Sequence, residues 1–464
     1  MDRIKSGIES LDYVLHGGIP TGSSVLIVGT PGTGKTILVN QIVFNNSSAE
    51  NKVLYFATMS EPQIKIMKFQ QEFSYFDINK FQQSVIYCDL GSILSRDGTK
   101  RALAYIDELL LEYQPKIIVI DTIKTLSDMI QSNLEIRQFM LELSAKLAVW
   151  ECTTFYLGEY TEKEIEERPE SAIVDGIIYL SGTEEKKFQK RFLRILKMRG
   201  TSFESGEIFF KITSDGLNLF PRLHLDVSNE VYNRNFSQRL SSGNQDLDRL
   251  FGGGIPRSTV TIISGGTGTG KTLMSISFAF EGLRSGESVI YATFEENPKQ
   301  LLNSALSIGM DLAPYIDSGK LIIVHISPVE LDLDEHIFLI QDYVRKINAS
   351  RLVIDSISSF ELGVEDKIKY TDYIWSLTNF LKASGVTTVM IHEIHESIHV
   401  LEMTKHGISF VADNLILLQS KEIGLDMKRY VRIVKCRSSY HEMGLKEYQI
   451  TKNGIQIDNE TGQN

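Results

Sequence analysis

Cysteine is scarce in this chain: Cys88, Cys152 and Cys436 are the only three among 464 residues, and their spacing fits no metal-ligand motif. Three scattered thiols suggest neither a disulfide framework nor a zinc site, and they indicate a reducing compartment. Long apolar runs are also missing. No stretch of about 18 uncharged apolar residues could span a membrane, and the first ten residues contain no run of the signal-peptide kind. We therefore expect a cytoplasmic protein without a membrane partner.

An excess of positive charge is absent as well. The chain has 48 Lys and Arg against 59 Asp and Glu, a formal net charge of −11. Because such a chain is poorly suited to coat nucleic acid, we do not expect a nucleic-acid partner. The composition is otherwise that of a globular protein, 42% hydrophobic and 23% charged. Single cores stop growing at roughly 250–300 residues, so a chain of 464 residues requires more than one domain.

A long internal repeat defines these domains. The segment SGIESLDYVLHGGIPTGSSVLIVGTPGTGKT begins at Ser6, and SGNQDLDRLFGGGIPRSTVTIISGGTGTGKT begins 236 residues later at Ser242. Near the end of each half, RILKMRG matches RIVKCRS. A duplicated unit of about 220 residues is too large for a solenoid repeat and is typical of an α/β domain. We predict domains over residues 1–223 and 238–464, joined by a polar linker over 224–237.

Each half alternates short apolar runs with longer stretches of helical spacing. Runs such as SSVLIVG, KIIVID, TVTIISG and RLVID are rich in Val, Ile and Leu and are bounded by Gly, Asp or Ser. Near-continuous apolar runs of this length are typical of strands buried on both faces of a parallel sheet. The alternation therefore predicts an α/β fold of two tandem domains, each a mostly parallel sheet flanked by helices.

The strongest motif is a glycine-rich loop that occurs once in each half, as GTPGTGKT and as GGTGTGKT. Each copy follows an apolar run and precedes a helical pattern, which is the context of a phosphate-binding P-loop. The glycines let backbone N–H groups surround phosphate oxygens, the lysine reaches the β- and γ-phosphates, and the final threonine binds Mg²⁺. We therefore predict two sites for ATP and Mg²⁺. Their loop residues are Gly29, Thr30, Pro31, Gly32, Thr33, Gly34, Lys35 and Thr36, and Gly265, Gly266, Thr267, Gly268, Thr269, Gly270, Lys271 and Thr272.

An aspartate is expected beside each loop. Asp121 and Asp355 each end an apolar run, in KIIVID and RLVID. An acid at the carboxyl end of a buried parallel strand lies near the P-loop in this architecture. We expect these aspartates to hold Mg²⁺ together with Thr36 and Thr272.

Further acids differ between the halves. In the second half, VIYATFEENP places Glu295 and Glu296 after a strand, where a carboxylate can orient or deprotonate a nucleophile. The first half has VLYFATMSEP, and alignment on AT leaves Ser60 opposite Glu295 and Glu61 opposite Glu296. A gap elsewhere would change which acid is lost, but one of two is absent in either case. We expect the first site to bind ATP and to hydrolyse it differently, with Glu61 as its candidate acid.

Two basic pairs occur near the ends of the halves, Lys197 with Arg199 and Lys435 with Arg437. Residues i and i+2 share one face of a strand, so each pair should project together while its apolar neighbours face the other way. Paired cations on an apolar strand favour an anion. We expect them to reach the nucleotide of a neighbouring subunit in a catalytic role, as arginine fingers do. A solvated edge-strand face is the alternative.

These motifs together resemble the KaiC family, the ATPases with tandem RecA-like domains to which the cyanobacterial circadian clock protein belongs. The resemblance covers nearly the entire chain and rests on the two long repeat segments and on YATFEENP, SIGMDL, VIDSISSF and KCRSSYHE. It implies two RecA-like P-loop NTPase domains in a two-tiered homohexamer, with ATP bound between subunits in both rings. It also implies ATP hydrolysis in the first ring, and serine/threonine autokinase, autophosphatase and ATPase activities in the second.

The chain departs from this family at the phosphorylated pair. The clock protein has an adjacent Ser-Thr before an apolar strand, whereas KHGISFVADNLILLQ has Ser409 and then Phe410. Ser409 is the candidate phosphoacceptor, and a hydroxyl bonded within its own loop is the alternative. Only DNETGQN follows YQITKNGIQI in place of the family's long tail. We therefore expect an ATP-driven timer, switch or signalling regulator instead of a full oscillator, with a KaiB-like protein as a candidate partner.

Two other functions stay open at this point. A DNA-dependent ATPase or helicase-type motor of the RecA and RadA kind shares the core and predicts DNA-stimulated hydrolysis. A ring that binds ATP without turnover is the other, and Glu295 and Glu296 argue against it. The His-rich IHEIHESIH is one residue short of zinc-protease spacing. We instead expect His392, at the end of an apolar run, to sense the γ-phosphate, with Glu159 in that region of the first half.

Overall fold

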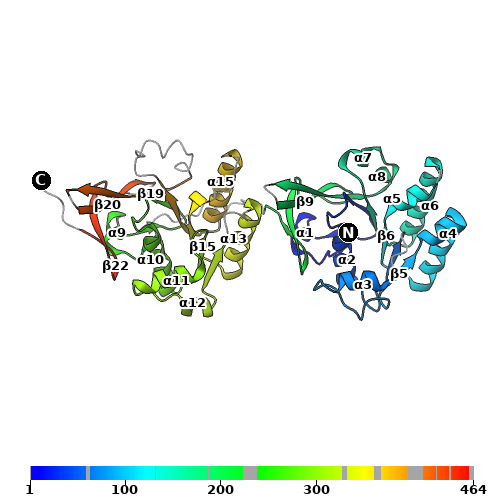
Figure 1. Ribbon diagram of the computed structural model, residues 1–464, viewed down its shortest axis with the longest axis horizontal. Helices are drawn as coiled ribbons and strands as arrows, with labels where there is room; N and C mark the ends of the chain where they lie inside the picture. The colour runs from blue at the N-terminus through cyan, green and yellow to red at the C-terminus, as the bar shows by residue number, and fades with distance from the viewer. Residues whose placement is uncertain are drawn as a thin grey trace. The chain divides into compact units, whose positions relative to one another are not determined.

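The computed structural model divides the chain into two compact units, Met1–Arg222 and Leu223–Asn464. Each unit contains a β-sheet flanked by helices (Figure 1). Glu61, Ser409 and the predicted linker lie outside the described residues. The described residues are 2–58, 63–130, 132–185, 188–222, 238–326, 332–359, 367–394, 411–424, 426–437 and 440–458.

The first unit alternates strands and helices along most of its length. Its elements are β1 (Arg3–Ile4), α1 (Glu9–Val14), β2 (Ile19–Pro20), β3 (Ser24–Gly29), α2 (Lys35–Asn46), β4 (Val53–Ala57), α3 (Gln63–Gln70), β5 (Val85–Asp89), α4 (Gly91–Tyr113), β6 (Ile117–Asp121), α5 (Ile123–Met129), α6 (Asn133–Val149), β7 (Thr153–Gly158), α7 (Glu162–Glu167), α8 (Pro169–Ile173), β8 (Gly176–Glu185), β9 (Phe188–Met198), β10 (Ile208–Thr213) and β11 (Gly216–Phe220).

The second unit repeats this succession. Its elements are β12 (Arg239–Leu240), α9 (Gln245–Leu250), β13 (Ile255–Pro256), β14 (Val260–Gly265), α10 (Lys271–Arg284), β15 (Val289–Thr293), α11 (Pro298–Ser307), α12 (Ala313–Asp317), β16 (Leu321–His325), α13 (Leu333–Ile347), β17 (Arg351–Asp355), α15 (Lys367–Ala383), β18 (Thr387–Glu393), β19 (Asn414–Ile423), β20 (Asp426–Cys436), β21 (Lys446–Thr451) and β22 (Gly454–Ile457).

The main sheets of the two units have the same topology. Within the described residues, the first sheet has nine strands in the order β11-β10-β9-β8-β3-β7-β6-β4-β5. The second has the order β22-β21-β20-β19-β14-β18-β17-β15-β16 when read from the matching edge. Six neighbouring strands, β8 to β5 and β19 to β16, are parallel, and the remaining three are antiparallel. The predicted fold class, two tandem α/β domains with mostly parallel sheets, is confirmed.

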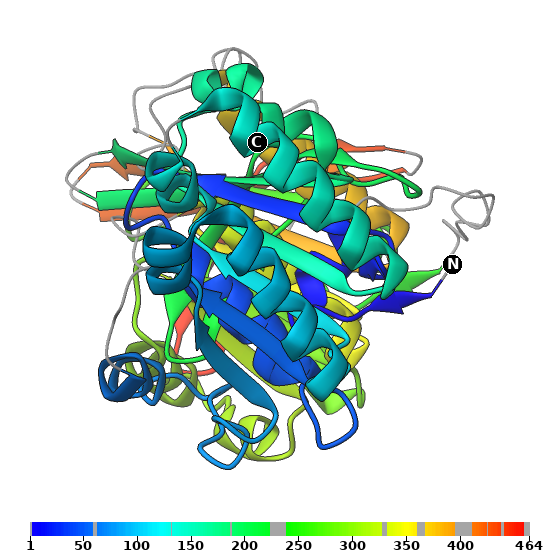
Figure 2. The same ribbon diagram turned by 90° about the vertical axis from the view of Figure 1, so that its right-hand side faces the viewer.

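Helices cover both faces of each sheet (Figure 2). In the first unit, α1 and α2 pack on one face and α4, α5 and α6 on the other. The side chains of β3 alternate between these two cores: Val25 and Ile27 contact the first, and Leu26 and Val28 the second. Burial on both faces explains why this strand is continuously apolar. In the second unit, α9, α10 and α11 cover one face, and α13 and α15 the other.

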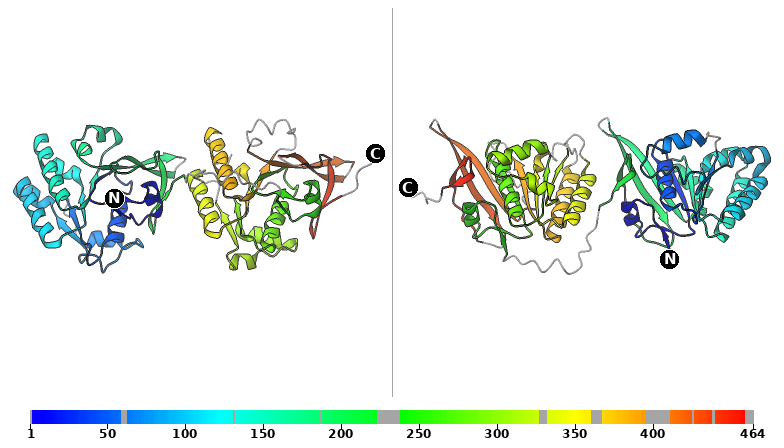
Figure 3. Two further views of the ribbon diagram at one scale, coloured as in Figure 1. Left: turned by 180° about the vertical axis from the view of Figure 1, so that it is seen from behind. Right: turned by 90° about the horizontal axis from the view of Figure 1, so that it is seen from below.

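The last parallel strand of each unit pairs with a long antiparallel neighbour, β8 with β9 and β19 with β20 (Figure 3). Ile177 pairs with Lys197 and Ile178 with Ile195, so the residue between them, Leu196, is an inserted bulge residue. Leu196 packs against the α4–α6 core and Met198 belongs to the α1–α2 core. The expectation that these neighbours share a face is therefore wrong, because the bulge shifts the strand's alternation.

None of the helices in the described part of the chain combines the length and apolar character needed to span a membrane.

Candidate functional site

Each glycine-rich loop joins a central strand to a helix, β3 to α2 and β14 to α10. Gly34 and Gly270 precede the helices with φ angles of 102° and 87°, in the left-handed region that favours glycine. The lysines fold back over their own loops. Lys35 Nζ donates to two loop carbonyls at 3.0 and 3.1 Å, and Lys271 Nζ donates to one at 2.8 Å. Burial lowers the pKa of both lysines, and nearby carboxylates oppose this shift.

The loop threonines meet the predicted aspartates in both units. Asp355 ends β17, and its Oδ2 accepts a hydrogen bond from Thr272 Oγ1 at 3.0 Å. Asp121 ends β6, and its Oδ2 lies 3.5 Å from Thr36 Oγ1. Because parallel strands end at the same edge of the sheet, the fold brings these residues together across more than 80 positions of sequence. Hydroxyl and carboxylate oxygens are ligands that Mg²⁺ prefers.

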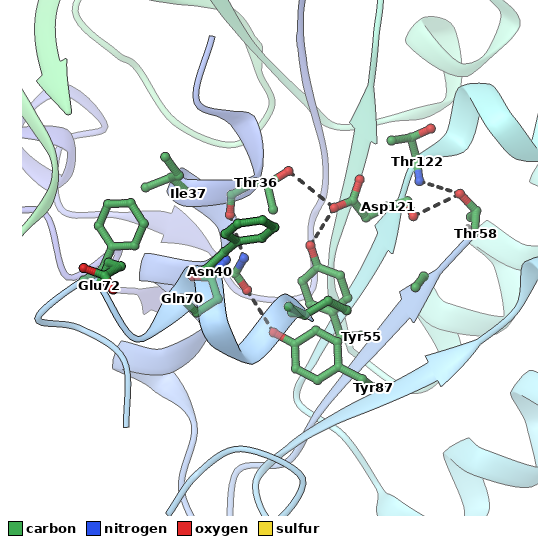
Figure 4. Close-up of a pocket in the computed structure, with 14 residues that line it drawn as sticks. Thr36, Ile37, Asn40, Tyr55, Thr58, Gln70, Glu72, Tyr87, Asp121 and Thr122 are labelled. Carbon is green, nitrogen blue, oxygen red and sulfur yellow. Dashed lines mark hydrogen bonds between the residues drawn. The ribbon is translucent and has the colours of Figure 1, made fainter. Parts of the chain in front are cut away.

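A buried tyrosine holds each aspartate, a feature that the sequence reasoning missed. Tyr55 on β4 donates its hydroxyl to Asp121 Oδ2 at 2.7 Å (Figure 4). Tyr291 on β15 donates to Asp355 Oδ2 at 3.1 Å, and its hydroxyl also lies 2.8 Å from Ser275 Oγ. Both tyrosines are the third residue of their strand, in VLYFA and VIYAT. Comparison of the two halves could therefore have found them.

The aspartates have raised pKa values. Burial raises the pKa of Asp355 to about 6, while the hydrogen bonds from Thr272 and Tyr291 oppose the shift. Burial likewise raises the pKa of Asp121 against the hydrogen bond from Tyr55. A buried carboxylate is costly to ionise without a cation, so both positions favour a bound positive charge.

Two cavities meet beside Asp121 in the first unit. One of about 560 Å³ follows the phosphate loop, and its lining includes Lys35, Glu159 and Arg191. The other, of about 570 Å³, lies below Thr36 between α2, α3 and β4 and is mainly aromatic and aliphatic (Figure 4). Thr36 and Asp121 line both cavities. The predicted Mg²⁺ ligands of this unit therefore stand at the junction of a polar cavity and an apolar one.

The candidate catalytic acids of the second unit follow β15. Glu295 Oε1 accepts hydrogen bonds from Ser356 Oγ at 2.8 Å and from Ser359 Oγ at 2.9 Å, on the turn after Asp355. Glu295 is one of the carboxylates that raise the pKa of Lys271 against its lowering by burial. The pKa of Glu296 is raised, chiefly by burial and also by Glu295. Glu295 therefore faces the phosphate loop in a fixed orientation.

The strand register changes the comparison of these acids between the halves. Ala57 pairs with Asp121 in the first unit, and Thr293 pairs with Asp355 in the second. Ala57 therefore occupies the position in its unit that Thr293 occupies in the other. The next residues, Thr58 and Phe294, each donate a backbone hydrogen bond to the aspartate carbonyl at 2.8 Å. Alignment on AT is therefore off by one residue.

The same offset of 236, continued along the sequence, brings Met59 and Ser60 to the positions of Glu295 and Glu296, and Glu61 to that of Asn297. Glu61 itself lies outside the described residues.

The basic pairs lie at the sheet edge opposite the phosphate loops. Lys197 is level with Ile177 near the start of β8, whereas the loop glycine Gly29 is level with Leu180. Lys197 Nζ donates to the Val174 carbonyl at 2.6 Å, and Lys435 Nζ donates to an equivalent carbonyl in the second unit at 2.6 Å.

The arginines of the two pairs bind aspartates at that same edge. Arg199 and Asp175 are 3.4 Å apart, and Arg437 and Asp413 are 3.9 Å apart. Neither pair reaches the phosphate loop of its own unit.

Two other arginines, also missed from the sequence, lie at the loop end of the same strands. Arg191 on β9 lines the polar cavity of the first unit. Arg429 on β20 is the residue six positions before Lys435, as Arg191 is before Lys197, and its Nε donates to the Gly268 carbonyl at 3.3 Å. Each unit therefore has a cation above its own phosphate loop.

His392 is the expected sensor of the γ-phosphate, but the structure places it within the sheet and not at the phosphate loop. His392 is 7% exposed, pairs with Ser264 inside the sheet and lies 3.2 Å from the Ser264 hydroxyl. The next residue, Glu393, ends β18 level with Gly265. In the first unit Gly158 ends β7 and pairs with Val28. The next residue, Glu159, therefore occupies the position that corresponds to Glu393 in the second unit. The two halves are therefore alike here, with a glutamate at the strand end.

Comparison with known proteins agrees with this geometry. The family model "ATPase: KaiC" matches residues 4–224 and again 240–462. The circadian clock oscillator protein KaiC of Picosynechococcus sp. is 29% identical over 98% of this chain and 90% of its own length. KaiC of Prochlorococcus marinus is 29% identical over 98% of this chain and 93% of its own, and KaiC 1 of Synechocystis sp. is 29% identical over 98% and 89%. The chain belongs to the KaiC family and is a KaiC-like ATPase with two tandem RecA-like domains.

Proposed function

We propose that each unit binds ATP with Mg²⁺ at its phosphate loop, residues 29–36 and 265–272, and that Glu295 is the catalytic carboxylate of the second unit. The observation that carries this proposal is the meeting of loop threonine and strand-end aspartate in both units, at 3.0 Å in the second. When bound, Mg²⁺ supplies positive charge that offsets the charge of the transferred phosphoryl group. Thr36 with Asp121, and Thr272 with Asp355, are the side chains that would hold it.

In the second unit, Lys271 would exchange its loop carbonyl for β- and γ-phosphate oxygens. Glu295, held by Ser356 and Ser359, accepts a hydrogen bond from the attacking hydroxyl or water and orients it. Glu296 lies beside it, and burial raises its pKa, which makes it a second candidate to accept the proton.

The first unit has the same lysine, threonine and aspartate but different residues after β4. In the sequence, continuation of the 236-residue offset aligns Met59 and Ser60, which are not acids, with Glu295 and Glu296. We therefore propose slower ATP hydrolysis in the first unit than in the second. Glu61 is the remaining candidate for a catalytic acid after β4 in the first unit.

We also propose that the chain assembles as a homohexamer with nucleotides between subunits. The basic pairs face away from their own phosphate loops, at the opposite edge of the parallel strands. From that edge Lys197, Arg199, Lys435 and Arg437 could contact a nucleotide only in a neighbouring subunit, where they would stabilise the charge of the transferred phosphoryl group.

The remaining proposals derive from the family resemblance. Autophosphorylation in the second unit would use Ser409 as acceptor, and a KaiB-like protein would be a partner. Cys88, Cys152 and Cys436 are buried as thiols, which is compatible with a reducing, cytoplasmic location. A timer or switch is the output that fits an ATPase of this kind.

The proposal is tested by phosphate release from the full chain and from Lys35→Ala, Lys271→Ala and the double variant. The double variant should lose about 100-fold or more of the parent rate, and Lys271→Ala should remove the larger share. Retained turnover in the double variant would rule out both loops as the site. Single-stranded DNA should leave the rate unchanged; stimulation would favour the motor alternative.

Kinase activity is tested by the intact mass of the chain after incubation with ATP and Mg²⁺, beside Ser409→Ala. A phosphate-sized gain that the variant lacks would support an autokinase with Ser409 as acceptor. No gain in protein that consumes ATP would remove the kinase proposal and leave the ATPase.

A further inference from the structure

Glu393 lies at the edge of the second phosphate loop and contacts it directly. Its carboxylate accepts a hydrogen bond from the hydroxyl of Thr267, the third residue of the loop. The strand register places Glu393 level with Gly265, where β14 enters the loop. Burial lowers the pKa of Lys271, and Glu393 is the largest of the carboxylate charges that oppose this shift. Glu393 is thus a negative charge beside the lysine that is expected to meet the γ-phosphate.

The same residue also contacts the turn that holds the candidate catalytic acid. The backbone N–H of Glu393 donates to Ser358 Oγ at 2.7 Å. Ser358 lies between Ser356 and Ser359, whose hydroxyls donate to Glu295 at 2.8 and 2.9 Å. A continuous set of contacts therefore runs from the phosphate loop through the end of β18 to Glu295.

The first unit has the glutamate but not these contacts. Pro31 occupies the loop position of Thr267 and carries no hydroxyl. Lys124 follows Asp121 by three residues, as Ser358 follows Asp355, so the two occupy corresponding positions. Lys124 Nζ donates to the backbone carbonyl of Glu159 at 3.2 Å. Glu159 lines the polar cavity beside Lys35. Both units thus have a glutamate beside the loop lysine, but the glutamates of the two units contact different side chains.

We propose that Glu393 is a positioning residue that makes the second unit distinguish ATP from ADP and transmits the difference to Glu295. The inference rests on the proposed ATP site of that unit. A γ-phosphate next to Lys271 repels the Glu393 carboxylate, whereas ADP places no phosphate there. The carboxylate then leaves Thr267, and its movement shifts Ser358 and the serines that orient Glu295. By the same argument Glu159 weakens ATP relative to ADP in the first unit, without transmission to an acid after β4.

The test is direct binding of two probes, ADP and the non-hydrolysable analogue adenylyl imidodiphosphate, each with Mg²⁺. The full chain would carry Lys35→Ala, so that calorimetry reports on the second unit. Glu393→Gln, which removes the charge and keeps a hydrogen-bond acceptor, should raise affinity for the triphosphate analogue relative to ADP by about tenfold. Glu422→Gln, an exposed glutamate on β19, is the matched control and should leave the ratio unchanged.

Hydrogen exchange of the peptide that contains residues 356–359 tests the transmission. In the parent, the analogue and ADP should give different protection of this peptide. Thr267→Val and Ser358→Ala, which each remove one hydroxyl, should make the two nucleotides give the same protection, and Thr267→Ser should restore the difference.

The outcomes separate this inference from the proposed function. If the parent unit binds neither probe, the proposed ATP site itself is wrong. If both probes bind and Glu393→Gln leaves their ratio within about twofold of the parent, Glu393 does not distinguish them and the inference is overturned. If the ratio changes but Thr267→Val and Ser358→Ala preserve the exchange difference, discrimination stands and transmission to Glu295 is refuted.

Discussion

Among single side chains, Tyr55 and Tyr291 have the clearest effect on the candidate sites because each donates to the aspartate expected to bind Mg²⁺. A hydrogen bond to a metal-binding carboxylate fixes its orientation and typically changes metal affinity or activity by about 10- to 100-fold. The ring itself is buried and packs within the α9–α11 core in the second unit. Removal of the hydroxyl alone therefore separates positioning from packing.

Tyr291→Phe should raise the Mg²⁺ concentration needed for half-maximal phosphate release by about tenfold, because Asp355 loses one of its two hydroxyl donors. The measurement is a Mg²⁺ titration of turnover in the Lys35→Ala background. Tyr315→Phe, which keeps the ring contact with Phe280, is the control. An unchanged Mg²⁺ requirement would remove Tyr291 as a positioning residue.

His336 is a second single residue with a measurable effect, on stability. It is 0% exposed on α13, is hydrogen-bonded to the Tyr373 hydroxyl, and lies 4.9 Å from the Phe294 ring centroid to centroid. Burial lowers the pKa of His336 to about 3. The neutral form therefore stabilises the fold at neutral pH, and this stability is lost as the pH falls from about 6.5, the pKa of an unfolded histidine, towards 3.

Between pH 7 and pH 5, the free energy of unfolding of the second unit should fall by about 2 kcal/mol more in the parent than in His336→Gln. Trp375, on α15, reports on this unit once Trp150 is replaced by Phe in both proteins. Urea unfolding followed by its fluorescence gives the difference, and other titrating groups cancel in the comparison. Equal pH dependence in the two proteins would show that His336 is not held neutral.

At the scale of elements, Arg351 at the start of β17 forms hydrogen bonds with α10 and with the segment before α9. The side chain is 2% exposed, and its guanidinium donates to Glu287 at 2.5 Å, to the Phe278 carbonyl at 2.9 Å and to the Ser241 carbonyl at 2.8 Å. A Cβ on Gly282 would lie 2.5 Å from Arg351 Cδ, so the glycine makes room for the arginine. The first unit has Ile at the arginine position and Asn at the glycine position.

A double-mutant cycle should show this dependence. Gly282→Ala alone should destabilise the second unit by about 2 kcal/mol through overpacking. Arg351→Ile alone should cost about 3 kcal/mol, since it removes the cation that pairs with the Glu287 carboxylate. In Arg351→Ile, the further change Gly282→Ala should cost close to nothing. Urea unfolding reported by Trp375 measures all four proteins, and additive costs would contradict the steric explanation.

For the molecule as a whole, the position of the basic pairs makes the proposed ring testable. Lys435 and Arg437 lie at the opposite edge of the strands from Lys271, so a complete site would need two subunits. A mutation in the loop and a mutation in the basic pair then damage different sides of one interface. Protein complementation distinguishes this arrangement from a site within one chain.

Lys271→Ala and Arg437→Ala should each lose second-unit turnover when pure. Mixed rings should regain activity above the mean of the two, because some interfaces combine the intact Lys271 of one subunit with the intact Arg437 of the next. The measurement is phosphate release after the proteins are mixed, dissociated and reassembled with ATP. Native mass spectrometry gives the ring size, and activity that never exceeds the mean would refute a shared site.

Much of the candidate site could be predicted because its residues are set by local sequence. The loops before Lys35 and Lys271 follow from glycine spacing between a strand and a helix, and Asp121 and Asp355 follow from their place after apolar runs. Strands buried on both faces must be continuously apolar, and the alternation of such runs with helical stretches indicates a parallel sheet. The same logic failed after β4, where AT appears in both halves but is shifted by one residue relative to the aspartates.

The sequence by itself determined the fold class, the two phosphate loops and their partner aspartates, since each depends on residues adjacent in the chain. The tertiary structure was needed to place the tyrosines on those aspartates, the bulge at Leu196 and Glu393 beside Thr267. Those features depend on strand register, which is fixed by the packing of side chains far apart in sequence on both faces of the sheet. A shift of one residue exchanges which side chain reaches the loop, as it does for His392 and Glu393.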